Sequence, residues 1–217
     1  SLLHFFYKST MPKEKLENWK KLQPMSVQLM QFFSKHIGEY PYKQYSVIQG
    51  GDGGMEYAMC TLIMGEGTLE GMLGTTSHEI AHTWFQFLLA TNEAKDYWMD
   101  EGFAQYYGEL AESEVLKTDF KKTMENIYDV YVSLAKSGYE QPLTTHADRF
   151  NLNQAYSISA YYKGFILLSQ LGYVIGDDAL AKTIKTYFNE WAFKHPKPND
   201  FIRVAEKVSG LQLGWYL

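Results

Sequence analysis

The sequence predicts an α+β fold that is mostly helical, with a small β element near the front of the chain. Apolar residues recur at helical spacing over most of the chain after residue 67. Strand-favouring residues and several glycines gather between residues 40 and 60. With 46% hydrophobic and 16% aromatic residues, a chain of 217 residues can bury a sizeable core. We therefore expect a single domain of residues 1–217, with a helix and the β element in 1–66 and a helical part in 67–217.

The front of the chain predicts one helix followed by extended structure. Residues 11–38 carry helical apolar spacing, and we expect a break at Pro24 because an interior proline removes a backbone hydrogen bond. Residues 40–60 read as extended, since Tyr45 and Val47 favour strands. The glycine-rich stretch 50–54 should interrupt or bend that strand.

The helical part follows in well separated segments. A helix is expected over 68–89 and another over 99–116, joined by a polar connection at 90–98. Asp100 is a candidate N-cap for the second of them. Further helices are expected over 119–136, 154–176, 178–192 and 198–209, with Gly210 as the C-cap of the last.

Charge and composition argue against several classes of protein. The net charge is −5 and the 20 basic residues are scattered, unlike the basic stripe of a nucleic-acid binder. No apolar run approaches the roughly 20 residues needed to span a bilayer. The single cysteine, Cys60, excludes an internal disulfide framework. Both ends read as cut from a longer protein, so the compartment stays unassigned, with an exported bacterial protein slightly favoured.

The segment "TTSHEIAHTWF" (Thr75–Phe85) carries a candidate metal site. Residues four apart lie on one helix face, so His78 and His82 can reach one ion. Zinc favours imidazole nitrogen and carboxylate oxygen, and its catalytic sites keep three protein ligands. Glu79 lies beside the first histidine, where it can accept a proton from an activated water. The same five-residue pattern also arises by chance around buried histidines.

A carboxylate that can serve as the third ligand follows in "WMDEGFA". Glu101 lies nineteen positions after His82, at the start of the next expected helix. A helix, a reversal and an antiparallel helix return that carboxylate to the histidine pair. Taken by itself, Glu101 is better explained as a first-turn glutamate that favours the helix dipole.

Together, HExxH, an eighteen-residue interval and the glutamate of W-x-x-E-G-F-A resemble the M1 family of zinc aminopeptidases, the gluzincin group that includes leukotriene A4 hydrolase. The resemblance implies a thermolysin-like catalytic domain with one Zn²⁺ held by His78, His82 and Glu101, and Glu79 as general base. It also implies flanking N- and C-terminal domains in the parent chain.

The segment "GGMEY" resembles the G-x-M-E-N exopeptidase motif of the same family. The resemblance assigns Glu56 to the substrate's free α-ammonium group, with Gly53 and Gly54 lining the substrate path. Tyr57 replaces the usual Asn. Without the zinc motif, a glycine-rich turn before an exposed glutamate would be the preferred interpretation of this stretch.

The segment "AYSISAYYKGFILL" resembles the family's Y-x-K-G region, whose tyrosine hydrogen-bonds the developing oxyanion. Lys163 and Gly164 set the register, which makes Tyr161 the matching residue. Family members often carry a glutamate seven positions after the third ligand, where this chain has Gly108. Glu109 or Gln105 is expected to orient a ligand instead.

The sequence therefore predicts a zinc-dependent aminopeptidase that acts on peptides with a free N-terminus. One alternative is a thermolysin-like endopeptidase, which needs the zinc site but no amine anchor. A second is a peptide-binding domain without turnover, and a third is an epoxide-hydrolase side activity. The preferred N-terminal residue and the oligomeric state do not follow from the sequence.

Overall fold

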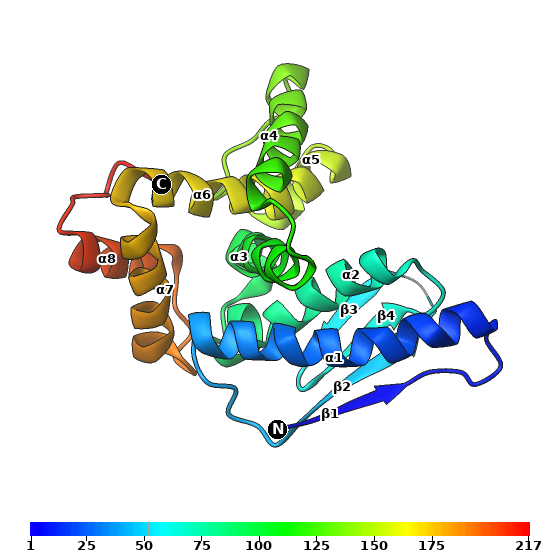
Figure 1. The fold of residues 1–217 in the computed structure, drawn as a ribbon. Coiled ribbons are helices and arrows are strands. Elements are labelled where there is room, and N and C mark those ends of the chain that lie inside the picture. The colour runs from blue at the N-terminus through cyan, green and yellow to red at the C-terminus, as the bar shows by residue number, and fades with distance from the viewer. Residues whose placement is uncertain (52) are drawn as a thin grey trace. The chain divides into compact units, whose positions relative to one another are not determined.

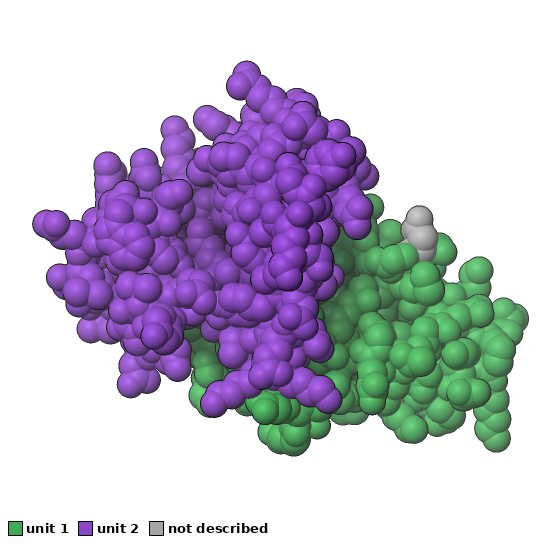
Figure 2. All heavy atoms as spheres, turned by 90° about the horizontal axis from the view of Figure 1, so that it is seen from above, with its two compact units in different colours: residues 1–83, 107–119 green, residues 84–106, 120–217 purple. Residues whose placement is uncertain are grey.

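The computed structural model describes residues 1–51 and 53–217. These residues divide into two compact units, drawn in different colours in Figure 2. Unit 1 contains residues 1–83 and 107–119, and unit 2 contains residues 84–106 and 120–217. The helix over residues 93–116 contributes its first part to unit 2 and its second part to unit 1, and each unit is described by itself below.

A four-stranded sheet is the first layer of unit 1. Its strands are β1 (Leu2–Phe6), β2 (Gln44–Gly50), β3 (Gly54–Tyr57) and β4 (Cys60–Met64), in the spatial order β1-β2-β4-β3. β1 and β4 both run parallel to β2, whereas β3 pairs antiparallel with β4. The sequence predicted the β element but missed β1, whose partner β2 lies about forty residues further along the chain.

The two faces of this sheet differ in what covers them. On one face, Tyr45, Val47, Thr61 and Ile63 are fully buried beneath α1 (Lys13–His36) and α2 (Leu69–Ala81) (Figure 1). The opposite face exposes apolar side chains from β1, β3 and β4. The more exposed of these are Leu2, Phe6, Met55, Tyr57 and Met64.

Helix α1 is continuous from Lys13 to His36, and the break predicted at Pro24 is absent; that prediction was wrong. Buried side chains stand on both sides of the proline, with Leu22 before it and Ser26 and Leu29 after it. Packing of this face keeps the helix intact across a residue that weakens it locally.

Helix α2 begins at its cap, Thr68, whose hydroxyl accepts a hydrogen bond from the Gly71 N–H at 3.2 Å. The predicted helix over 68–89 is divided: α2 ends at Ala81, and a π-helical segment, η1 (Thr83–Leu88), follows with a kink at Phe85. The boundary falls at His82, immediately after the predicted metal-binding turn.

Helix α3 (Glu93–Leu116) begins earlier than predicted, within the stretch expected to be a polar connection. The Asn92 carbonyl accepts hydrogen bonds from the Lys95 and Asp96 N–H groups and so starts the helix. Non-helical torsions at Asp96 mark a kink. Asp100 lies inside the helix and is only 2% exposed, so its prediction as an N-cap was wrong.

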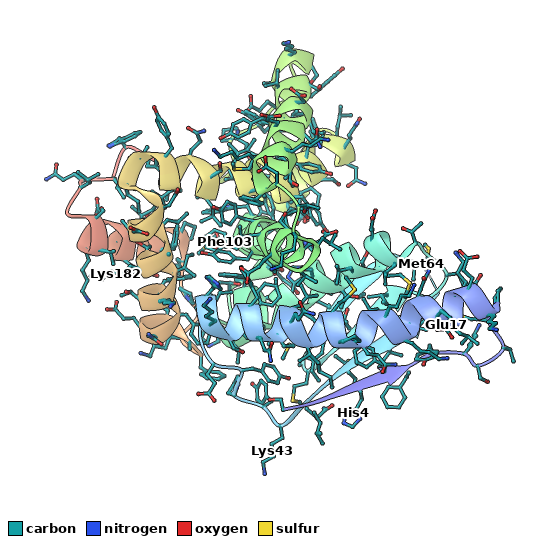
Figure 3. The ribbon with its side chains drawn as sticks, in the orientation of Figure 1. His4, Glu17, Lys43, Met64, Phe103 and Lys182 are labelled. Atoms are coloured by element: carbon teal, nitrogen blue, oxygen red, sulfur yellow. The ribbon has the colours of Figure 1, made fainter. Side chains whose placement is uncertain are left out.

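Unit 2 is helical in the part of the chain that the structure describes. Its elements after α3 are α4 (Phe120–Ser137), η2 (Ala147–Arg149), α5 (Asn153–Ile158), η3 (Ser159–Lys163), α6 (Gly164–Ile175), α7 (Asp177–Trp191) and α8 (Pro198–Ser209). Phe103, labelled in Figure 3, lies in its core against Phe85, Trp98 and Phe201.

These elements confirm the predicted fold class, mostly helical with a small β element at the front. The last helix ends where the sequence indicated, because Gly210 adopts the left-handed conformation with φ +74°. Among the residues described, no helix is both long and apolar enough to cross a membrane.

Candidate metal centre

The two histidines of the HExxH segment lie at the end of α2. His78 is the last basic residue of the helix, and His82 is its C-cap, with its N–H bonded to the His78 carbonyl. His82 is 1% exposed and His78 is half-buried. Helical geometry therefore places both rings on one face, as the spacing predicted.

The distance between the two imidazoles suits binding to a single ion. Their Nε2 atoms are 3.1 Å apart, and the rings stand nearly perpendicular at 86°. Two nitrogens at zinc-ligand distance from one tetrahedral ion are about 3.3 Å apart. The donor atoms and their spacing thus fit zinc.

Glu79 is buried to 6% exposure and lies against strand β3. Gly54 allows this approach, because a Cβ at that position would collide with the Glu79 carboxylate and with the Thr75 methyl group. The glycine of β3 and the glutamate of α2 are therefore in direct contact. Gly53, just before the strand, has a positive φ of +24° and is exposed.

Glu56, on strand β3, lies close to Glu79 and His82. In the register of the sheet it pairs with Thr61, which pairs with Val47 in the next strand, so Glu56 shares the face covered by α2. Its neighbours Met55 and Tyr57 point to the opposite, exposed face. One ligand atom each from Glu56, Glu79 and His82 lie within 4.8 Å of one another.

In unit 2, Glu101 lies in α3 and is half-buried. Tyr156, on α5, is near enough for the carboxylate to affect it. Burial raises the pKa of the Tyr156 phenol, and the negative charge of Glu101 raises it further. Tyr156 also packs on Tyr97, with ring centroids 4.9 Å apart. The phenol of Tyr156 therefore belongs to the surroundings of Glu101.

Tyr161 lies in η3, a π-helical segment between α5 and α6, and is half-buried. The Lys163 ammonium group donates hydrogen bonds to the Glu140 carboxylate at 2.6 Å and to the Gln141 carbonyl at 3.2 Å. The lysine of the Y-x-K-G segment thus ties η3 to the loop that follows α4.

The glycine of the same segment fixes η3 and α6 against α3. A Cβ at Gly164 would lie 2.8 Å from the Gly102 Cα, and a Cβ at Gly102 would lie 2.5 Å from the Gly164 Cα. Two helix backbones therefore meet at these glycines, next to Glu101 on one and near Tyr161 on the other. The sequence pattern indicated only a register from Gly164 and no role for Gly102.

Gly108, in unit 1, is another glycine in close contact with the backbone of a neighbouring helix. A Cβ there would lie 3.0 Å from the His78 Cα. From the sequence, Glu109 or Gln105 was expected to orient a ligand in place of the glutamate that the family often carries here, and a backbone contact was not predicted. The glycine inside a helical pattern could have indicated this contact, because such a glycine often marks close packing.

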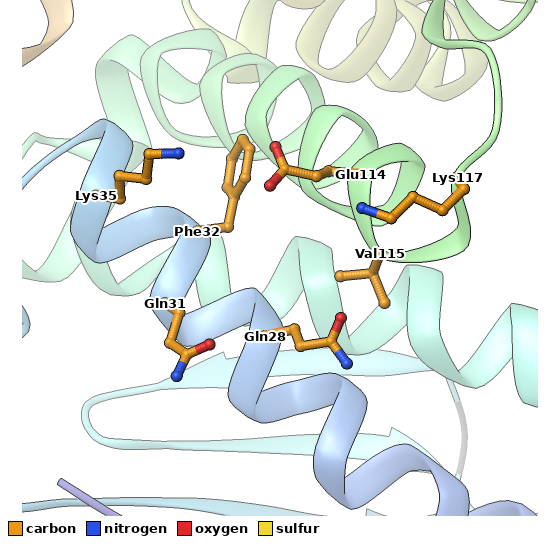
Figure 4. A pocket seen from close by; sticks show the side chains of 7 residues that line it. All are labelled: Gln28, Gln31, Phe32, Lys35, Glu114, Val115 and Lys117. Atoms are coloured by element: carbon orange, nitrogen blue, oxygen red, sulfur yellow. The ribbon is translucent and has the colours of Figure 1, made fainter.

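A hollow of about 270 Å³ opens elsewhere in unit 1, between α1 and the last turns of α3 (Figure 4). Phe32 and Val115 form its apolar part. Its rim carries the exposed polar side chains of Gln28, Gln31, Lys35, Glu114 and Lys117. None of the predicted site residues lines it.

A helix-borne histidine pair with a buried carboxylate between its members, facing a glutamate on a neighbouring strand, describes a metal-dependent hydrolase of the HExxH class. The comparisons with known proteins are more specific. Residues 23–216 match the peptidase family M1 domain, and the chain belongs to that family.

Several curated relatives are aminopeptidases. Aminopeptidase N of Streptomyces lividans is 26% identical over an alignment of 200 residues, and the match covers 84% of this chain and 23% of that protein. Human aminopeptidase N is 26% identical over an alignment of 132 residues, and the match covers 58% of this chain and 14% of that protein. This chain thus spans less than a quarter of these relatives.

Solved structures share the fold. The M1 zinc metallopeptidase from Deinococcus radiodurans superposes with a TM-score of 0.67 at 20% identity, covering 92% of this chain and 41% of that one. A mutant of a two-domain M1 zinc metallopeptidase bound to L-tryptophan gives 0.71 at 19% identity, covering 97% and 45%.

Proposed function

We propose that this chain is the catalytic part of a zinc-dependent aminopeptidase, which hydrolyses the first peptide bond of peptides with a free N-terminus. Membership of peptidase family M1 supports hydrolysis of peptides. The aminopeptidase relatives and the zinc metallopeptidase structures support the type of peptidase and the metal.

The proposed ligands of the zinc ion are His78, His82 and Glu101. The 3.1 Å between the two Nε2 atoms supports the first two. Glu101 is proposed as the third ligand from its place in the W-x-x-E-G-F-A segment, nineteen positions after His82, in a chain that belongs to peptidase family M1. When bound, zinc supplies the Lewis acidity that polarises the scissile carbonyl and acidifies a water.

Glu79 is the proposed general base. Its carboxylate is held beside His82 and against β3, so it can accept a proton from the attacking water. The same carboxyl group can then deliver that proton to the leaving amine. Gly53 and Gly54 are proposed to line the substrate path, where a backbone without side chains lets a peptide lie close.

The position of Glu56 is the observation that carries the choice of an aminopeptidase. A substrate ammonium group paired with Glu56 lies within a few ångströms of Glu79 and His82, because their ligand atoms are within 4.8 Å of one another. Within one amino acid the nitrogen and the carbonyl carbon are about 2.5 Å apart. Only the first residue therefore fits between the amine anchor and the hydrolytic groups.

Tyr161 is proposed to donate a hydrogen bond to the negative charge that develops on the carbonyl oxygen. A phenol suits this task because it stays protonated at neutral pH. The contacts of Lys163 with the loop after α4, and of Gly164 with α3, support the proposal by fixing the segment that carries Tyr161.

The test compares aminoacyl-arylamides with and without a free α-amino group. We expect the protein to hydrolyse the free-amine substrates alone, and Glu56→Gln to lose most of that activity through a higher KM. Glu66→Gln is the matched control, an exposed glutamate on the loop after β4. Equal cleavage of N-acetylated substrates, unaffected by Glu56→Gln, would instead establish the thermolysin-like endopeptidase.

We further propose that the chain works beside flanking domains of a longer polypeptide. Its relatives extend well beyond the matched region. The uncovered sheet face, with Leu2, Phe6 and Met64 between about half and two-thirds exposed, offers apolar surface for a neighbouring domain. Cys60 lies on the same face, so a neighbouring domain should slow its reaction with a thiol reagent in a longer form of the protein. If Cys60 reacts equally fast in the longer form and in this chain, the face is uncovered and this proposal fails.

A further inference from the structure

The second half of α3 touches α2 through backbone atoms at the turn that carries His78. A Cβ at Gly108 would lie 3.0 Å from the Cα of His78, 3.2 Å from its nitrogen and 3.5 Å from the Ser77 carbonyl carbon. Backbone atoms cannot rotate away as a side chain can. An added methyl group must therefore push the two helices apart at His78.

A hydrogen bond holds the same two turns together. The hydroxyl of Ser77, which is fully buried, donates to the Gly108 carbonyl at 2.7 Å. Ser77 directly precedes His78. Gly108 of α3 therefore holds one turn of α2, residues 77 and 78, through both a backbone contact and a hydrogen bond.

The next contact along these helices is of a different kind. The three atoms nearest to a Cβ at Gly74 would all belong to the carboxyl group of Glu112, with its oxygens at 3.0 and 3.3 Å and its carbon at 3.4 Å. Gly74 lies one turn before His78 on α2, and Glu112 one turn after Gly108 on α3, as expected for antiparallel helices. The end of a glutamate side chain can move, so this position tolerates a methyl group that Gly108 does not.

We propose that Gly108, together with the Ser77 hydroxyl, is a positioning residue for the His78 imidazole. By closing the distance between the helices, it sets where the turn of α2 that carries His78 lies relative to the second half of α3. A backbone contact then does what the sequence analysis expected from the side chain of Glu109 or Gln105. The inference rests on the proposed zinc site.

The test measures zinc affinity by competition with a chromophoric chelator, and the visible spectrum of the cobalt-substituted protein. Circular dichroism of the metal-free variants reports their folding. We expect Gly108→Ala to bind zinc about 10–100-fold more weakly and to change the cobalt spectrum. Ser77→Ala should weaken binding several-fold. The matched control Gly74→Ala, in the same helix pair, should stay within twofold of the unmodified protein.

Each outcome separates the inference from the proposed function. Should Gly108→Ala fail to fold, the Ser77→Ala and Gly74→Ala pair still decides the question. Equal zinc affinities and unchanged cobalt spectra in Ser77→Ala and in any folded Gly108→Ala overturn the positioning role while leaving the zinc site intact. An unmodified protein that binds no zinc, or binds it equally well after His78→Ala, overturns the proposed function itself.

Discussion

Glu79 is the residue on which the proposed chemistry depends most directly. Its carboxylate lies beside an imidazole of the pair but is not proposed as a ligand. We predict that Glu79→Gln retains stoichiometric zinc and loses activity by about 10²–10⁴-fold, the usual contribution of a general base. Steady-state kinetics and metal analysis on the same preparation test this. Loss of zinc in step with activity would show that Glu79 is a ligand instead.

Glu112 makes the stability of the folded protein depend on pH, separately from any role in catalysis. Burial raises the pKa of its carboxyl group to about 7, and the negative charges of Glu109 and Glu70 add to the shift. Below the ordinary pKa of about 4.5 both the folded and unfolded states are protonated. Between about 4.5 and 7 only the unfolded state releases its proton, so stability falls as the pH rises.

Glu112→Gln should remove this pH dependence. We predict that the variant is more stable than the unmodified protein at pH 8, by about 1 kcal/mol once solvent screening of this half-buried group is allowed for. At pH 4 the two should unfold alike. Thermal unfolding at both pH values tests the prediction, and a variant that is less stable at pH 8 contradicts it.

Among elements, the crossing of α3 with the start of α6 decides how Glu101 and Tyr161 are held. A Cβ added at Gly164 would lie 2.8 Å from the Gly102 Cα and 3.1 Å from the Trp98 carbonyl oxygen. We predict that Gly164→Ala lowers stability by about 1–3 kcal/mol through overpacking. It should also lower kcat.

Gly176→Ala is the comparison for stability alone. Gly176 lies at the other end of α6, with φ +92° and no neighbouring atom within 4 Å of the position that a Cβ would take. This change strains the backbone but leaves the crossing intact, so we expect a loss of stability without a loss of kcat per folded molecule. If Gly164→Ala behaves in the same way, the crossing has no part in catalysis.

The elements also show which parts of the fold a sequence determines locally. The limits predicted for α7 and α8 were correct to within one residue, because amphipathic spacing and the glycine at 210 are local signals. β1 was missed because its identity as a strand depends on pairing with distant β2. The break predicted at Pro24 and the cap predicted at Asp100 failed because packing overrode local preference.

The candidate site was predictable to a similar degree. The spacing of His78 and His82 predicted their shared face, since both lie on one helix. The approach of Glu56 to Glu79 follows from the register of the sheet, which no local pattern encodes. The contact of Gly108 with His78 was not predicted, because a glycine carries no chemistry of its own to mark the contact.

For the whole molecule, a zinc site that exists only in the folded state couples metal binding to stability. Zinc at about a thousand times its dissociation constant should stabilise the protein by about 4 kcal/mol. For a chain of this size we predict a rise in Tm of about 8–16 °C. Calorimetry with and without zinc measures the rise. A variant with both His78→Ala and His82→Ala should show none, and an equal rise in that variant would contradict the proposed site.

The most direct test of the central claim is to follow, by mass spectrometry, the products that the zinc-loaded protein forms from one pentapeptide, offered with a free and with an acetylated N-terminus. The account predicts loss of single residues in order from the free N-terminus and an intact acetylated peptide. Internal cleavage of either peptide, or cleavage of the acetylated one, would contradict it.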